Sequence, residues 1–275
     1  MENLLPYAPA LPNPRALATD LDGTLIPLPE TETHQADLLS LKQLLEKNRI
    51  PLVFATGRHL ASIITAIDAF SLPIPDCIIA DVGTTIYERT EKGWAPIISY
   101  AHHLAASLDG VSLLEIEQLF QKYDALTLQS FENQSRFKLS YECSQDSTFE
   151  LAKHLQLELD SIAAPYAITA SLAPFATHGL IDVLPRSASK ASALRWWAQQ
   201  MGWDFGSLLF AGDSGNDLAA LTSGFRSILV ANADPELVEQ VKASHQIAGW
   251  NDRLYIAKQS ATSGVLEGCR WFGVI

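Results

Sequence analysis

One segment, residues 15–25, limits the folds open to this chain more than any other; it reads RALATDLDGTL. Its apolar run at 16–18 is typical of a buried strand, and two acids, Asp20 and Asp22, follow directly. Burying two carboxylates at the end of a strand costs several kcal/mol each unless a cation or hydrogen bonds compensate. We expect the compensation to be a divalent metal ion of the kind that prefers oxygen ligands.

The residue types around the two acids suit a catalytic turn. Asp20 can offer a carboxylate oxygen to the metal and also attack an electrophile, whereas Asp22 can offer its backbone carbonyl and keep its side chain for proton transfer. Gly23 permits a sharp turn, and we expect the Thr24 hydroxyl to hold the Asp22 carboxyl. The alternative is an Asx-turn that simply ends a strand, because Asp and Gly are common there.

Apolar runs and amphipathic segments alternate through both ends of the chain. Strands are predicted at 50–55 and 77–80, and helical spacing of apolar residues appears at 38–45 and 63–67. Strand, helix, strand, helix, strand is typical of a parallel sheet with crossover helices. The same pattern resumes after Ser187, with a helix from Lys190, strands at 208–211 and 227–230, a helix from Asp234 and an apolar helix at 265–272.

The middle of the chain has a different pattern. After a hairpin within 86–97, it reads twice as helix, strand, strand, with strands predicted at 126–130, 136–143, 166–172 and 179–184. This order predicts a four-stranded antiparallel sheet with two helices on one face. We therefore predict an α/β fold: a Rossmann-like core with a parallel sheet, made of residues 1–95 and 183–275, and an inserted α+β cap, residues 96–182. Residues 1–14 form a proline-rich extension of the core.

The cap strands alternate in polarity, which predicts one polar face. On the second strand the apolar set is Phe137, Leu139, Tyr141 and Cys143, which should face the helices, and the polar set is Lys138, Ser140 and Glu142. Gln129, Thr169 and Ser171 fall on the polar face of their own strands. Such a face is often simply exposed to solvent, but it can also close over a polar ligand.

Four polar segments follow predicted strands or open a helix: 20–24, 56–58, Lys190 and 212–217. In an open parallel sheet, ligands bind outside the carboxyl ends of the strands. The four segments are therefore expected to form one site. A TGR tripeptide or a single lysine carries little information alone, but the four together in this order are specific.

The composition limits the partners of the chain. Its 275 residues include 31 Asp and Glu against 19 Lys and Arg, a formal charge of −12. Nucleic acid and anionic membranes need a basic face, so we expect neither as a partner, and no apolar run is long enough to span a bilayer. Cys77, Cys143 and Cys269 have no metal-binding spacing, which predicts reduced, mostly buried thiols in a cytoplasmic protein.

Together these segments resemble the motifs of the haloacid-dehalogenase (HAD) superfamily of phosphatases. Within it, the chain is similar to the sucrose-phosphate phosphatase group, whose cap is inserted after the third strand. The features that carry this resemblance are ATGR at 55–58, VGT at 82–84, KLSY at 138–141, DVLP at 182–185 and GDSGND at 212–217. The resemblance covers nearly the whole chain after the proline-rich start. It implies a Mg²⁺-dependent phosphatase of a sugar phosphate, with sucrose 6-phosphate as the first candidate.

The resemblance also implies a role for each residue of the predicted site. Asp20 would be the nucleophile that forms an aspartyl-phosphate, and Asp22 would protonate the departing sugar oxygen and then deprotonate water, which suits a carboxyl whose pKa is raised by burial. Thr56, Gly57 and Arg58 would hold the phosphoryl group. The remaining roles are charge neutralisation by Lys190, Mg²⁺ binding by Asp20, the Asp22 carbonyl and Asp213, contact with phosphate or sugar by Asn216, and sugar binding by Lys138 of the cap. Asp217 is either a further metal ligand or acts through water or Lys190.

Other functions fit parts of the pattern. A dehalogenase is disfavoured because Asp22, Asp213 and Asp217 are present and that chemistry does not need them. A phosphomutase with a similar cap stays open. A non-catalytic phosphosugar-sensing domain, docking on the synthase that makes the phosphosugar, would be expected to lose Asp20 or Asp22, and both are present. Among substrates, mannosylfructose phosphate, trehalose 6-phosphate and mannosylglycerate phosphate would also suit a polar cap face.

Overall fold

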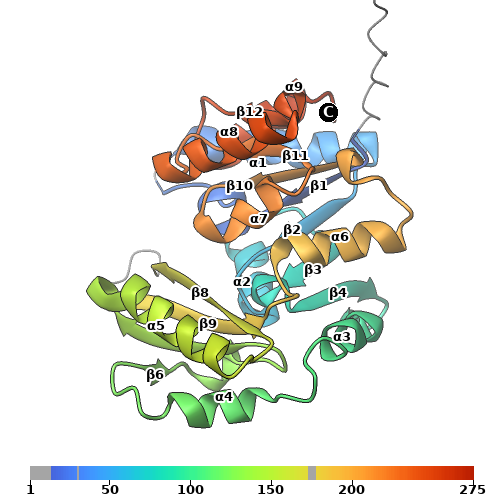
Figure 1. The fold of residues 1–275 in the computed structure, drawn as a ribbon. Helices are drawn as coiled ribbons and strands as arrows, with labels where there is room; N and C mark the ends of the chain where they lie inside the picture. Colours follow the sequence, from blue (N-terminus) through green and yellow to red (C-terminus); the bar gives the residue numbers. More distant parts are fainter. Residues whose placement is uncertain (1–13, 30, 173–177) are drawn as a thin grey trace, which may run out of the picture.

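The computed structural model describes residues 14–29, 31–172 and 178–275. The described chain forms two lobes, each built on its own sheet (Figure 1). Residues of both lobes line a cleft. The predicted proline-rich extension lies outside the described residues except for Pro14.

The larger lobe is a core with an eight-stranded sheet. In spatial order its strands are β12 (Leu254–Ile256), β11 (Arg226–Leu229), β10 (Leu208–Gly212), β1 (Ala16–Thr19), β2 (Leu52–Ala55), β3 (Cys77–Ala80), β4 (Thr85–Thr90) and β5 (Gly93–Pro96). The strands from β12 to β3 are parallel, and the hairpin β4–β5 extends the edge next to β3 in antiparallel fashion. The strand that leads into Asp20 therefore lies near the centre of the sheet.

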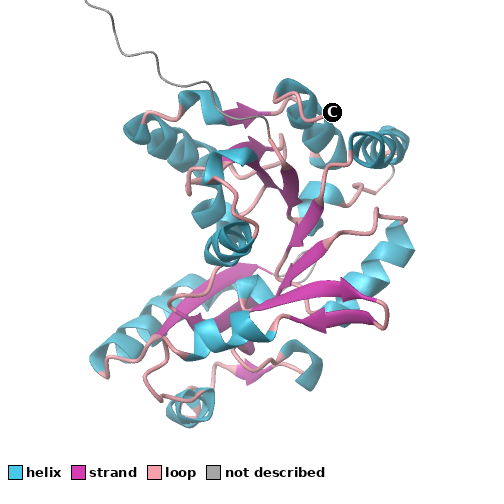
Figure 2. Ribbon diagram, turned by 90° about the vertical axis from the view of Figure 1, so that its right-hand side faces the viewer, coloured by secondary structure: helices cyan, strands magenta, loops and turns pink. Residues whose placement is uncertain are grey.

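Helices cover both faces of the core sheet, so its central strands are buried on both sides (Figure 2). One face carries α1 (Glu32–Asn48), α2 (Leu60–Phe70) and α9 (Ala261–Trp271). The other face carries α3 (Ile98–Ala105), α6 (Lys190–Gln200), α7 (Leu218–Leu221) and α8 (Pro235–Ala248). This layering explains why the core strands read as short, continuous apolar runs.

The smaller lobe is the predicted cap. Its antiparallel strands lie in the order β6 (Thr127–Leu128), β7 (Leu139–Ser144), β9 (His178–Pro185) and β8 (Tyr166–Leu172). The helices α4 (Leu113–Phe120) and α5 (Thr148–Ser161) pack in a single apolar cluster against one face of this sheet. The predicted fold class, a parallel core with an inserted α+β cap, is confirmed.

Three details differ from the sequence predictions. The short helix α3 was not predicted; it buries Tyr100 and Leu104 in the apolar cluster of the core. The strand β12 was not predicted either, because three residues are too few to show a period. Phe137 does not face the cap helices: it precedes β7, and its side chain packs in the core cluster.

The division of the chain between core and cap stays a proposal. The predicted boundary at 182/183 falls inside β9, a single strand of the cap sheet. We therefore propose that the second boundary lies at the end of β9, and that the first lies after α3, whose apolar residues belong to the core cluster.

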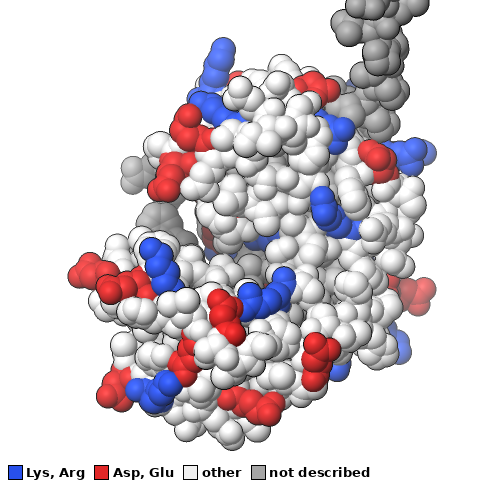
Figure 3. All heavy atoms as spheres, viewed as in Figure 1, with Lys and Arg blue, Asp and Glu red and all other residues white. Residues whose placement is uncertain are grey.

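The surface gives few further constraints. On the face seen in Figure 3, acidic and basic side chains are interspersed. None of the described helices is long and apolar enough to cross a membrane. The three cysteines are buried free thiols, as predicted.

Candidate active site

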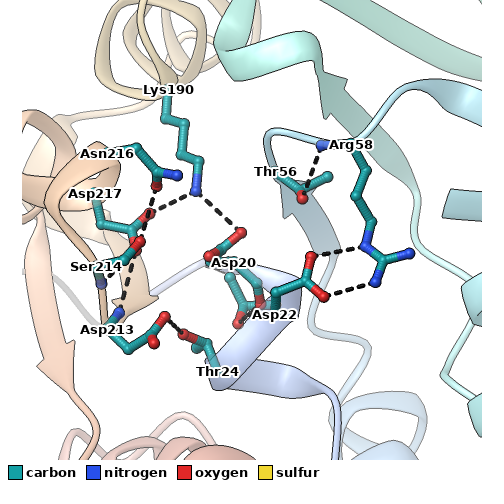
Figure 4. Close-up of polar contacts among 11 residues, drawn as sticks. Asp20, Asp22, Thr24, Thr56, Arg58, Lys190, Asp213, Ser214, Asn216 and Asp217 are labelled. Atoms are coloured by element: carbon teal, nitrogen blue, oxygen red, sulfur yellow. Dashed lines mark hydrogen bonds and ion pairs between the residues drawn. The ribbon is translucent and has the colours of Figure 1, made fainter. Parts of the chain in front are cut away.

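The predicted site forms at the carboxyl edge of the core sheet. Asp20 follows β1, Thr56 follows β2 and Asp213 follows β10, and these three strands are neighbours. Because parallel strands end at the same edge, residues far apart in the sequence meet there (Figure 4). Lys190, in the first turn of α6, reaches the same point from above the sheet edge in this view.

A buried ion-pair network surrounds the carboxylate of Asp20. Lys190 Nζ lies 3.0 Å from Asp20 Oδ1 and 2.7 Å from Asp217 Oδ1, and these side chains are at most 6% exposed. Burial raises the pKa of Asp20 to about 8, against the opposing effect of Lys190. Burial also disfavours the charged form of Lys190, but the attraction of Asp20 and Asp217 outweighs it and raises the pKa of Lys190. The lysine is therefore held as a cation beside Asp20.

Asp217 makes contacts with both of its carboxylate oxygens. Oδ1 accepts a hydrogen bond from Lys190 at 2.7 Å, and Oδ2 accepts from the backbone N–H groups of Asp213 and Ser214, each at 3.1 Å. Gly212 makes room for this carboxylate, since a Cβ at Gly212 would lie 2.7 Å from Asp217 Cγ. Of the two roles that the sequence leaves open, these contacts favour the one in which Asp217 acts through Lys190.

Three carboxylates form a candidate metal centre. Oxygen atoms of Asp20, Asp213 and Asp217 all lie within 4.8 Å of one another. Burial, and then repulsion by Asp217, raise the pKa of Asp213 to about 6. With one lysine against three carboxylates, the ionised cluster has an excess of negative charge, and all of its donors are oxygens. This donor set fits a hard divalent cation.

The Thr24 hydroxyl does not hold Asp22, so that prediction is wrong. It donates instead to Asp213 Oδ1 at 2.8 Å. The turn at Gly23, where φ is +73°, brings Thr24 to the Asp213 side while Asp22 points towards Arg58 (Figure 4). A Cβ at Gly23 would collide with the Asp213 carboxylate, so the glycine is needed both for its backbone conformation and for this close approach.

Asp22 pairs with Arg58 at the mouth of the cleft. Arg58 Nε and Nη2 donate to the two carboxylate oxygens of Asp22 at 2.7 and 2.6 Å, a bidentate arrangement that fixes the carboxylate plane. The hydrogen bond to Asp22 raises the pKa of Arg58. The Asp22 side chain is 37% exposed, so the expectation that it is buried is wrong, because the turn carries it past the end of the strand.

Residues 56–58, which we call the TGR loop, form the third side of the site. The Thr56 side chain is buried, and its hydroxyl oxygen accepts a hydrogen bond from the Arg58 N–H at 3.3 Å. Gly57 lines the cleft beside Thr56 and Arg58. The loop thus presents the Thr56 hydroxyl, the accessible backbone of Gly57 and the Arg58 guanidinium to the cleft.

A cleft of about 800 Å³ lies between the core edge and the cap. Of the ten predicted site residues, eight line it: Asp20, Asp22, Thr56, Gly57, Arg58, Lys138, Asp213 and Asn216. Lys190 and Asp217 lie buried beneath them. The cap wall also includes Gln129, Thr169, Ser171 and Asp182, together with Leu172 and Leu180. The predicted polar residues Gln129, Thr169 and Ser171 therefore face the cleft, but the wall is not polar throughout. Glu142 lies outside the cleft, 3.8 Å from His178.

Two residues of the site were not found from the sequence. Asn232 follows β11 and donates to the carbonyl oxygen of Gly23 at 2.8 Å, while its own oxygen accepts from the Ala261 N–H at 2.8 Å. Asp81 follows β3, is buried, and lies 3.3 Å from Lys138 Nζ. Both stand just beyond the carboxyl end of a core strand, and that position was the available signal.

The fold and the site together define a class. A Rossmann-like core with an inserted α+β cap, and an aspartate after the central strand held by a buried lysine, are the features of HAD-superfamily phosphatases, which are phosphoric monoester hydrolases. The chain belongs to the family described as Sucrose-6F-phosphate phosphohydrolase, whose family model matches residues 13–273. The resemblance stated from the sequence is therefore confirmed.

Three similar proteins illustrate the range of this class. A putative HAD-like hydrolase of Nitrosococcus oceani is 35% identical, over 93% of this chain and 71% of that protein. The mannosylfructose-phosphate phosphatase of Agrobacterium fabrum is 28% identical, over 94% of this chain and 97% of that protein. The sucrose-phosphatase of Synechocystis sp., solved with sucrose and phosphate, is 25% identical and superposes with a TM-score of 0.78, over 94% of this chain and 98% of that one.

Proposed function

We propose that the protein is a Mg²⁺-dependent phosphatase that hydrolyses a glycosyl phosphate, with sucrose 6-phosphate as the first candidate. One observation carries the proposal: the carboxylate of Asp20 and the polar residues of the cap open into one cleft of about 800 Å³. Its size lies within the range of small-molecule sites. A phosphoryl group at the core wall and a hydroxyl-rich leaving group at the cap wall would match the two surfaces.

In the first chemical step, an Asp20 carboxylate oxygen forms a bond to phosphorus while the bond between phosphorus and the sugar oxygen breaks. Asp22, protonated at this stage, gives its proton to the departing sugar oxygen. The Thr56 hydroxyl and the Gly57 N–H hold the phosphoryl oxygens, and Lys190, 3.0 Å from Asp20, offsets the negative charge. The product is an aspartyl-phosphate on Asp20 and a free sugar.

In the second step, water attacks the phosphorus of the aspartyl-phosphate. The Asp22 carboxylate takes a proton from this water, and the bond between phosphorus and Asp20 breaks to release inorganic phosphate. Asp22 thus acts as acid and then as base. Its hydrogen bonds from Arg58 at 2.6 and 2.7 Å fit the carboxylate form that takes the proton from water, whereas the protonated acid of the first step requires one of them to open. At the end of the cycle Asp20 is again a free carboxylate and Asp22 is again protonated.

The acidic cluster supports the choice of Mg²⁺. Asp20, Asp213 and the backbone carbonyl of Asp22 would hold the ion, with Asp217 as a further ligand or acting through Lys190. When bound, the ion supplies positive charge next to the phosphoryl oxygens. The all-oxygen donor set and the excess of carboxylates over lysine at this point are the observations that favour it.

A screen for phosphate release over a phosphosugar panel tests the proposal. The panel contains sucrose 6-phosphate, mannosylfructose phosphate, trehalose 6-phosphate and mannosylglycerate phosphate, with p-nitrophenyl phosphate as the small ester. We expect at least one phosphosugar to be hydrolysed with a higher kcat/KM than p-nitrophenyl phosphate. Hydrolysis of the small ester alone would contradict the choice of substrate class, and no turnover at all would favour the sensing domain. A phosphomutase would move the phosphate within the sugar without releasing it.

The synthase that makes the phosphosugar stays a predicted partner. Co-elution of the two purified proteins in gel filtration would test it.

A further inference from the structure

A buried ion pair beside the cleft crosses from the cap to the core, and of its two residues Lys138 lines the cleft. Lys138, which immediately precedes the cap strand β7, points its Nζ atom to within 3.3 Å of Asp81 Oδ1, in the loop after the core strand β3. Both side chains are at most 5% exposed. Among the ion pairs of the described residues, this is the one that joins the cap sheet region to a loop of the core sheet.

This arrangement is costly for the fold. Asp81 Oδ1 is buried and accepts no hydrogen bond from the described residues, and the cation that faces it is Lys138 Nζ at 3.3 Å. Asp81 and Val82 both adopt left-handed backbone conformations, with φ of +52° and +57°, which cost about 1–3 kcal/mol each for residues other than glycine. Buried charge and backbone strain together beside the cleft, which Val82 and Lys138 line, indicate a function other than stability.

The loop that carries Asp81 is tied to the rest of the active site. The N–H of Asp81 donates to the Arg58 carbonyl at 3.0 Å and the N–H of Val82 donates to the Thr56 carbonyl at 3.1 Å, so the loop is bonded to both ends of the TGR loop. On its other side, a Cβ at Gly83 would collide with the Ser189 carbonyl, just before Lys190. A shift of Asp81 would therefore also move the TGR loop and the start of α6, which surround the proposed phosphoryl position.

A second carboxylate, that of Asp182 on the cap strand β9, attracts Lys138 from the cap side. Ser140 donates a hydrogen bond to Asp182, and Asp182 and Lys138 line the same cleft. Burial raises the pKa of Asp81 and of Asp182, and the attraction of Lys138 opposes the rise in each. The ammonium group of Lys138 is thus attracted by a core carboxylate, which it contacts at 3.3 Å, and by a cap carboxylate, and its three N–H donors can also reach a ligand.

We propose that Asp81 is a positioning residue of the sugar subsite: it holds the Lys138 ammonium at the boundary of core and cap, and so ties recognition of a polyhydroxyl leaving group to a closed cap. The inference rests on the proposed function for the identity of the leaving group. It does not need that function for the contact between cap and core. Asp81 acts through Lys138 and touches no reacting atom.

A double-mutant cycle tests the proposal. Asp81→Asn keeps the shape of the side chain and removes its charge. We expect kcat/KM for the phosphosugar to fall on the order of 10-fold, through KM more than kcat, and that for p-nitrophenyl phosphate to change less than about 3-fold. In a Lys138→Met background, Asp81→Asn should have no further effect on the phosphosugar. Asp68→Asn, at an exposed position of α2, is the matched control.

Three outcomes would overturn the proposal: no loss in Asp81→Asn, an equal loss on both substrates, or the same loss in the Lys138→Met background. The first would make the contact irrelevant, the second would place Asp81 in the phosphate site, and the third would give it a role independent of Lys138. If Asp81→Asn does not fold, Asp81→Ser is measured in the same cycle.

A distance measurement makes the test independent of the substrate. Spin labels on Glu46→Cys in the core and Lys153→Cys in the cap, both exposed positions, report how the two lobes sit, since the native cysteines are buried. We expect Asp81→Asn to broaden the distance distribution relative to the wild type. If no phosphosugar is hydrolysed, the proposed function fails and this measurement alone decides on Asp81. An unchanged distribution then overturns the positioning role, and a broadened one supports it.

Discussion

The two walls of the cleft are built in different ways. The core wall takes its polar groups from loops that follow the adjacent strands β1, β2 and β10, and a buried network of hydrogen bonds and ion pairs fixes them. The cap wall takes single residues from several strands of a sheet and orients them by alternation. The core wall is therefore suited to the phosphoryl group, which is the same in every substrate. The cap wall is suited to the leaving group, which differs from one substrate to another. Changes in the core wall should affect every substrate, and changes in the cap wall only the larger ones.

The largest effect is expected at Asp20. Asp20→Asn removes the proposed nucleophile, so turnover of the phosphosugar and of p-nitrophenyl phosphate should both fall by roughly four orders of magnitude or more. The fold should survive because the side chains are nearly isosteric and Lys190 keeps Asp217 at 2.7 Å. Steady-state kinetics and circular dichroism give the two readouts. Near-normal turnover would rule out the covalent mechanism.

Removal of the metal should act on both substrates in the same way. EDTA is expected to abolish activity, and added Mg²⁺ to restore it. Ca²⁺ should bind but support little turnover, because it takes more ligands at longer distances than Mg²⁺ and could engage both oxygens of Asp20. Assays of metal-free protein titrated with each ion give the comparison. Full activity with calcium would contradict the assignment of Asp20 as both ligand and nucleophile.

Although Asp22 belongs to the core wall, its replacement should affect substrates unequally, according to how much their leaving group needs a proton. Asp22→Asn removes the proposed acid, so release of a sugar alkoxide should slow by about 10²–10⁴-fold. Nitrophenolate is a good leaving group that needs no proton, so the first step with p-nitrophenyl phosphate should be much less affected. A burst of nitrophenol in rapid-mixing experiments would report that step. Equal slowing of that step on both substrates would assign Asp22 a role in binding instead.

The core wall could be predicted from sequence because each part is local. A strand followed by two acids, glycine and threonine defines a turn within a few residues, and the rule that ligands bind at the carboxyl ends of parallel strands brings the parts together. The partner of Thr24 could not be predicted in this way. It depends on Asp213, 189 positions away in the chain, and on the left-handed backbone conformation of Gly23.

The cap wall could be predicted only as a pattern. Alternation predicts that Lys138, Thr169 and Ser171 lie on the polar face, and all three line the cleft. The pattern fails at Phe137, which packs with the core. Phe137 and Lys138 both precede β7, so strand alternation does not fix the direction of either side chain, and Lys138 reaches the cleft without being part of the strand. The contact between Asp81 and Lys138 joins two lobes, and no local period reports how separate lobes meet.

Lys138→Ala is expected to affect only the phosphosugar. Loss of a charge-assisted hydrogen bond should cost about 1.5–3 kcal/mol of transition-state binding, whereas p-nitrophenyl phosphate does not reach the cap. The unpaired Asp81 should also lower the unfolding free energy, so thermal unfolding is measured alongside kcat/KM. Glu142→Gln, four residues further along on β7 and outside the cleft, is the matched control. Equal losses on both substrates would place the sugar on another surface.

The smallest effect is expected at Ser171, which lines the cleft from β8. Its hydroxyl can offer one neutral hydrogen bond to a sugar hydroxyl, worth about 0.5–1.5 kcal/mol, so Ser171→Ala should lower kcat/KM for the phosphosugar roughly 2- to 10-fold. Turnover of p-nitrophenyl phosphate should stay unchanged. Ser161→Ala, at the exposed end of α5, is a control within the cap but away from the cleft. Because Lys138 precedes β7 whereas Ser171 lies on β8, the two losses should add in the double variant if the sugar contacts both residues. A Ser171→Ala variant that discriminates between phosphosugars would show which of them extends across the whole cap sheet, and one that affects none would confine the sugar to the side of Lys138.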